Sequence, residues 1–173
     1  LAGGAGSLTA INIPLLGNTT EQVTSVKHAN GNDVWVVTHP VNTGDFHSYL
    51  VTSTGVNPTP VISVVGPVYT GGPVGAIKLS PNGARIAAGI STQTLQIYDF
   101  DSSTGLLSNY IPLPTQGAAC WVEFSPDASK VYTNAWGAGM INQFDLCAGS
   151  QTAIAATRYT WQPANSVGCL QLA

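Results

Sequence analysis

Apolar and polar positions alternate along residues 121–125, and this period of two is typical of a β-strand with two different faces. Residues 131–133 resume with β-branched and aromatic side chains, which favour a second strand. Between the two runs, Pro126 presets φ for the first corner of a turn and Asp127 suits the second corner. The pattern predicts a tight hairpin.

The chain contains this hairpin pattern more than once. Residues 79–87 repeat it, with Pro81 in the place of Pro126. Residues 26–36 form a weaker copy in which Ala29 stands at the proline position. A repeat of roughly 45 residues that carries several strands is typical of the blades of a β-propeller.

The repeat divides the whole chain into strands, and no segment has the apolar spacing of a helix. We therefore predict an all-β protein, a single β-propeller segment over residues 1–173 built of four-stranded antiparallel blades. Three full blades are expected, with a lone strand at each end, so the propeller is partial and has open strand edges. The expected parts are a blade remnant at 7–16, blades at 21–68, 75–113 and 119–161, and the start of a further blade at 168–173. Either the chain is a fragment, which we favour, or the missing strands come from another chain.

Composition narrows the function classes. Only 8% of the residues are charged, and the net charge is −3 with five Lys and Arg, so a basic patch for nucleic acid is not expected. No apolar run reaches the roughly 20 residues of a membrane-spanning helix. The chain begins at Leu1 and shows no signal peptide, which suggests a mature or trimmed product.

Two sequence stretches resemble known repeats. KLSPNGARIAAGISTQTLQIYDFDSSTG and EFSPDASKVYTNAWGAGMINQFDL resemble the YVTN/WD-like (WD40-like) propeller repeat. EQVTSVKHANGNDVWVVTHPVNTGDFHSYLVTSTGV is similar to the propeller region of large secreted surface proteins of the Bacteroidetes, the type that the type IX secretion system exports. The resemblance implies an extracellular or outer cell-surface location and a role related to adhesion.

The three cysteines, Cys120, Cys147 and Cys169, lie in the last third of the chain, and their spacing fits no zinc motif. For an exported protein, one disulfide among them is plausible, and three buried thiols are the alternative. The spacing does not decide which two would pair, because pairing depends on the distances between their Cα atoms.

Metal and cofactor chemistry is weakly indicated. Asp99, Asp101 and Ser103 superficially resemble a calcium loop, but a hairpin turn capped by Asp101 explains the same letters. The histidines His28, His39 and His47 are expected to be turn and surface residues rather than metal ligands. We predict no metal and no cofactor.

Aromatic residues suggest a contact surface instead. Trp35 and Trp121 are expected to pack between blades, whereas Trp136 is the better candidate for an exposed contact with a ligand. Loops 40–44, 70–73 and 135–139 would form broad, shallow contacts.

From these observations we predict a non-enzymatic surface binding or assembly module with no catalytic residues. Its partners would be a protein or glycan at the cell surface, or other copies or the remainder of its own propeller through the open edges, with no nucleic acid and no membrane span. The alternatives are a lactonase-like propeller hydrolase whose catalytic residues lie outside this segment, and a carbohydrate-binding propeller.

Overall fold

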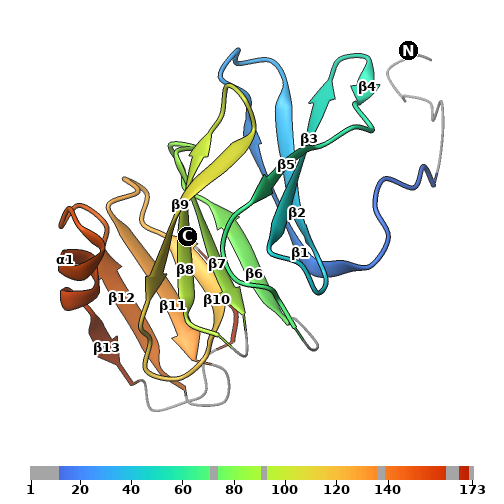
Figure 1. Cartoon of the computed structure of the whole chain (residues 1–173). Coiled ribbons are helices and arrows are strands. Elements are labelled where there is room, and N and C mark those ends of the chain that lie inside the picture. Colours follow the sequence, from blue (N-terminus) through green and yellow to red (C-terminus); the bar gives the residue numbers. More distant parts are fainter. Residues whose placement is uncertain (1–11, 71–73, 91–92, 136–138, 163–167, 172–173) are drawn as a thin grey trace.

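Three antiparallel sheets follow one another along the chain and make up most of the molecule (Figure 1). The structure is a computed structural model that describes residues 12–70, 74–90, 93–135, 139–162 and 168–171 of the 173-residue chain. Each sheet is built from consecutive strands, so neighbours in sequence pair with one another. The prediction of an all-β protein made of antiparallel sheets is confirmed.

The first sheet begins with three long strands, and two short strands both pair with the third of them. Its strands are β1 (Thr19–Lys27), β2 (Val34–Pro40), β3 (Asp45–Thr52), β4 (Gly55–Val56) and β5 (Val61–Val64).

The other two sheets have four strands each, paired in the order in which they occur. The second sheet contains β6 (Gly75–Leu79), β7 (Arg85–Ile90), β8 (Leu95–Asp101) and β9 (Leu106–Leu113). The third contains β10 (Ala119–Phe124), β11 (Lys130–Ala135), β12 (Ile141–Asp145) and β13 (Tyr159–Trp161).

The prediction that the chain has no helix is wrong. Helix α1 (Gln151–Ala156) precedes the short strand β13, within the blade at 119–161 that was predicted to consist of strands alone. Ser150 caps the helix, because its side-chain oxygen accepts a hydrogen bond from the N–H of Ala153. The alanine-rich segment favours a helix, and Ile154 is the one side chain that it buries.

The lone strand expected at 7–16 is not seen in the part that the structure describes. Residues 12–16 have no regular secondary structure, and residues 7–11 lie outside the described ranges. The backbone carbonyl of Leu15 instead accepts a hydrogen bond from the hydroxyl of Tyr49, at 3.2 Å. The segment therefore lies against the outer face of the first sheet. At the other end, residues 168–171 are also irregular.

One turn joins the first two strands of every sheet, as the repeat predicted. The residue at its αL corner has φ between 58° and 76°, and its backbone N–H donates a hydrogen bond to the carbonyl three residues earlier. Ala29, Pro81 and Pro126 occupy the same position of this turn. The three bonds run from Gly31 to His28, from Gly83 to Ser80 and from Ala128 to Ser125, at 2.9, 2.8 and 2.9 Å.

Two apolar cores hold the sheets together, and the second sheet contributes to both. In β7, Ile86 and Ala88 belong to the core shared with the first sheet, whereas Ala87 between them belongs to the core shared with the third. This alternation follows from the pleat, which points successive side chains to opposite faces. Phe46 and Phe124, from the two flanking sheets, are fully buried. The second sheet is therefore covered on both faces, which explains why its strands are almost continuously buried.

The backbones of neighbouring sheets meet closely at Gly89. A Cβ at this position would lie 2.6 Å from the carbonyl oxygen of Cys120 and 2.9 Å from Val122. Because the obstructing atom is backbone, the strands themselves would have to move. Glycine is thus required by the close approach of β7 to β10.

We expect Gly89→Ala to lower the free energy of unfolding by about 1–3 kcal/mol, through overpacking between β7 and β10. Gly17→Ala is the matched control, since no atom lies within 4 Å of a Cβ there. Urea denaturation followed by fluorescence measures both. Equal effects of the two substitutions would contradict the proposed close contact.

Candidate functional site

Two opposite charges meet on the first strands of the second and third sheets. Strand β6 packs beside both β1 and β10, so the first strands of the three sheets, here called the leading strands, lie together. Lys78 on β6 and Glu123 on β10 occupy equivalent positions, and Lys78 Nζ lies 2.8 Å from Glu123 Oε2. The Glu123 side chain is 9% exposed, whereas that of Lys78 is 44% exposed. The carboxylate is thus largely withdrawn from solvent while its partner reaches it.

The backbone also holds the carboxylate. Glu123 Oε1 accepts a hydrogen bond from the N–H of Phe124 at 3.1 Å, which leaves Oε2 to the lysine. Charged hydrogen bonds in a partly desolvated site are stronger than those in water. This is a fixed carboxylate with a defined orientation. Glu21 is the chain's other glutamate, and it lies exposed on β1.

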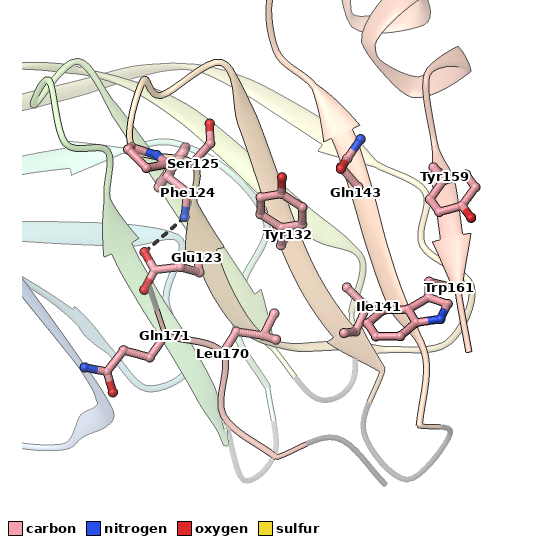
Figure 2. Close-up of a pocket in the computed structure, with 11 residues that line it drawn as sticks. Glu123, Phe124, Ser125, Tyr132, Ile141, Gln143, Tyr159, Trp161, Leu170 and Gln171 are labelled. Atoms are coloured by element: carbon pink, nitrogen blue, oxygen red, sulfur yellow. Dashed lines mark hydrogen bonds between the residues drawn. The ribbon is translucent and has the colours of Figure 1, made fainter. Parts of the chain in front are cut away.

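A groove of about 560 Å³ extends from Glu123 across the open face of the third sheet (Figure 2). Glu123 and Gln171 lie at one end of the groove, and Tyr159 and Trp161 lie at the other. Tyr159 and Trp161 are 64% and 55% exposed. The complete lining consists of Glu123, Phe124, Ser125, Pro126, Tyr132, Ile141, Gln143, Tyr159, Trp161, Leu170 and Gln171.

The register of the strands explains where this groove lies. Gln143 pairs with Tyr132 and Tyr159 in the third sheet, as Ile97 pairs with Ala87 and Ile111 in the second. The second-sheet residues are aliphatic and form the core against the third sheet. The outer part of the groove therefore lies on the face of the third sheet that corresponds to the core-forming face of the second sheet. Amphipathic aromatic and amide groups stand there in place of aliphatic ones. Only the Glu123 end lies on the leading strand.

A second polar cluster is buried between the first and second sheets. The hydroxyls of Tyr69 and Tyr98 both donate to Gln96 Oε1, at 2.8 and 2.6 Å. The ring of His39 stacks on Tyr69 with 3.7 Å between centroids. All four side chains are inaccessible to solvent. Burial raises the pKa of both phenols well above their usual range, so they stay neutral donors.

His39 is held neutral in this cluster. Burial lowers its pKa to about 4, although the carbonyl of Pro40, 2.7 Å from Nδ1, partly opposes the shift. Since a carbonyl can only accept, Nδ1 carries the proton and Nε2 has a free lone pair. Nε2 has no hydrogen-bond partner among the described residues. The prediction of a surface histidine is wrong for His39, because its strand ends inside the contact with the second sheet.

The stretch that resembles a calcium loop forms a hairpin turn. Asp101 accepts hydrogen bonds from Ser103 N and Oγ at 2.8 and 2.6 Å, and from the hydroxyl of Thr104. These bonds lower the pKa of Asp101. Asp99 instead lies 3.7 Å from Arg85, as Asp145 lies 3.2 Å from Lys130 at the equivalent place in the third sheet. A repeated cross-strand ion pair accounts for Asp99. Within the described ranges, no group of three or more metal-ligating side chains is found.

The other predicted residues are dispersed. Trp35 is buried, and its indole N–H donates to the carbonyl of Ser102, which confirms that this tryptophan packs inside the fold. Trp136 lies outside the described residues, as do residues 71–73 and 136–138 of the predicted contact loops. The cysteines Cys120, Cys147 and Cys169 are free thiols in this structure. In the described part of the chain, no helix has the length and apolar character needed to cross a membrane.

Sequence reasoning missed the Lys78–Glu123 pair and the exposed Trp161. The equivalence of Lys78 and Glu123 in the repeat was visible, and opposite charges at equivalent positions of adjacent blades could have suggested their contact. Trp161 gave no such signal, because nothing in its sequence neighbourhood marks it as exposed.

Comparison with known proteins supports the fold. A scan of protein-family models and a search of curated proteins found no match to this chain. Among solved structures, a periplasmic gluconolactonase from Pseudomonas aeruginosa matches with a TM-score of 0.54 and 15% identity, over 76% of this chain and 36% of that one. A candidate 6-phosphogluconolactonase from Bacteroides fragilis NCTC 9343 matches with a TM-score of 0.56 and 14% identity, over 80% and 39%.

A third structure, of a functionally unknown protein from Desulfotomaculum acetoxidans DSM 771, has a TM-score of 0.58 and 16% identity, over 82% of this chain and 41% of that one. At these identities the similarity shows the fold, and the β-propeller prediction is confirmed. The chain spans about two fifths of the length of these structures.

The comparisons also correct one prediction. We expected a non-enzymatic module, but propellers of this fold that match the chain carry the names of lactonases. The prediction that the chain is not an enzyme is therefore contradicted. No catalytic residue was predicted from the sequence, and the fold alone does not decide the function.

The buried His39 predicts a pH dependence of stability. Its folded pKa of about 4 lies below the ordinary 6.5, so between these values the unfolded chain binds a proton that the folded chain does not. The neutral His39 contributes about 3 kcal/mol to the free energy of unfolding above pH 6.5, and this contribution is lost as the pH falls toward 4. Denaturant titrations across this range should show the loss. His39→Phe should flatten it, and His28→Phe, in a half-exposed turn, should not; an unchanged slope in His39→Phe would contradict the assignment.

Proposed function

We propose that this chain contributes three blades to a propeller that hydrolyses a lactone, with Glu123 as the general base. The observation that carries the proposal is the oriented Lys78–Glu123 pair on the leading strands, at the end of a groove. The names of the matching lactonases support the reaction class. Since the chain spans about two fifths of those proteins, the activity is proposed for the assembled propeller.

In the proposed step, Glu123 removes a proton from a water molecule that attacks the lactone carbonyl carbon. The ring C–O bond then breaks, and the departing alkoxide oxygen takes the proton from Glu123, which yields the hydroxy acid. Lys78 stays protonated and orients the carboxylate. We place the reaction at the Glu123 end of the groove, because the outer end corresponds to a blade face that is core in the second sheet.

A sugar lactone is the proposed substrate class. Gln143 and Gln171 line the groove and offer amide donors and acceptors, which suit a polyhydroxylated ring. The matching proteins named as gluconolactonase and candidate 6-phosphogluconolactonase support the same class.

We also propose that the protein works outside the cytoplasm. One matching structure is a periplasmic enzyme, and the sequence resembles exported propellers. The finer predictions stay predictions: the YVTN/WD repeat identity, type IX export, an extracellular or cell-surface position, and protein or glycan partners. None of the described contacts bears on adhesion.

We expect Glu123→Gln to lower kcat for gluconolactone hydrolysis by about 10²–10⁴-fold, because it removes the general base. Base consumption at constant pH measures the reaction, in this chain and in any longer polypeptide that carries it. Glu21→Gln is the matched control, an exposed glutamate on β1 that should leave the rate unchanged. Hydrolysis no faster than in buffer, or equal rates for the two variants, would contradict the proposal.

A further inference from the structure

Two cysteines stand at equivalent places on neighbouring leading segments. Cys120 is the second residue of β10, and Cys169 takes the corresponding position in the repeat, within residues 168–171, here called the C-terminal segment. Cys120 is fully buried, whereas Cys169 is exposed. The C-terminal segment also supplies Leu170 and Gln171 to the wall of the groove (Figure 2).

One side chain ties the two cysteine regions together. Asn134 Oδ1 accepts a hydrogen bond from the N–H of Trp121 at 2.9 Å, and Asn134 Nδ2 donates to the carbonyl of Gly168 at 2.7 Å. The peptide that follows Cys120 and the peptide that precedes Cys169 are therefore bound to the same carboxamide. This double contact places the two cysteines beside each other.

Electrostatics agree with this placement. Burial raises the pKa of the Cys120 thiol to about 11, and the nearby Cys169 contributes to the shift. Cys120 is thus a poor nucleophile toward an external reagent. The exposed Cys169 is the thiol that such a reagent meets first.

Cys147 lies elsewhere. It follows β12, which runs parallel to β10, so it lies at the edge of the sheet where these strands end, whereas Cys120 lies where β10 begins. Its backbone N–H donates to Asp145 Oδ1 at 2.9 Å, which fixes it in the turn after β12. The fold therefore separates Cys147 from the other two cysteines.

We propose that Cys120 and Cys169 are a redox-sensitive pair that forms a disulfide in the presence of a small-molecule disulfide such as oxidised glutathione. Cys169 attacks the reagent, forms a mixed disulfide and releases one thiol. Cys120 then attacks Cys169 Sγ and releases the second thiol. Each protein thiol loses one hydrogen, and the reagent disulfide is reduced to two thiols.

The disulfide would covalently attach the C-terminal segment to β10. In the reduced state Asn134 bridges β10 and the segment through one hydrogen bond to each, whereas a covalent bond would fix Leu170 and Gln171 at the groove. The bond would act as a latch on one wall of the groove. This proposal does not depend on the groove's being catalytic.

Peptide mapping tests the proposal directly, since trypsin separates the cysteines. Cleavage after Arg85, Lys130 and Arg158 gives peptides 86–130, 131–158 and 159–173, each with one cysteine. After equilibration of the folded chain with glutathione buffers and quenching with acid, mass spectrometry under non-reducing conditions identifies the linked peptides. We expect the 86–130/159–173 pair to exceed the other two pairs together by about tenfold, because the fold gives these thiols a high effective concentration.

Unfolded chain is the control. The Cys120–Cys169 bond closes the longest of the three possible loops, and an unfolded chain favours the shorter ones. In guanidinium chloride the preference should therefore reverse. Predominant linkage to Cys147 in the folded chain, or a stable glutathione adduct on Cys169 with Cys120 still reduced, would overturn the proposal.

Variants of Cys147 and Asn134 test whether the Asn134 carboxamide positions the two cysteines. Cys147→Ser should leave the yield of the Cys120–Cys169 bond unchanged. Asn134→Ala should lower that yield several-fold, whereas Asn32→Ala, in an exposed turn, should not. Circular dichroism of each variant establishes that it is folded before oxidation. An unchanged yield in folded Asn134→Ala would show that the carboxamide does not position the pair.

Discussion

The structure depends on the burial of both faces of the second sheet. A four-stranded sheet has two apolar faces here, and it gains stability only when a neighbouring sheet covers each of them. Ile86 and Ala87 are adjacent in sequence yet pack into different cores, one on either side. This arrangement brings β1, β6 and β10 together, and it thereby brings Lys78 to Glu123. The candidate site is a consequence of how the sheets stack.

Much of the fold was predictable because it is determined by local sequence. The turn at Pro81 and Pro126 requires an αL corner, and its recurrence identified the blade from sequence alone. Helix α1 was not predictable by periodicity, because its six residues bury a single side chain, Ile154. Local capping by Ser150 decides its conformation, and the pattern of apolar positions carries no trace of it.

The candidate site was harder to predict, since its residues come together only through packing between sheets. His39 looked like the end of a surface strand, but Tyr69 and Phe46 enclose it. Glu123 looked like an ordinary polar position on a strand until Lys78 was placed beside it. Lys78 and Glu123 are 45 residues apart, and the pattern within either blade alone does not show that they touch.

Each sheet is formed from consecutive strands, and this has a consequence for synthesis on the ribosome. The hairpins of one blade need only residues that have just emerged, so pairing within a blade involves short loops and is fast. Its faces remain uncovered until the next blade has also emerged, because the apolar cores lie between sheets. The nascent chain would therefore gain its secondary structure blade by blade, while its stability would lag by one repeat. Each sheet therefore exposes an apolar face to aggregation while the next one is still being made.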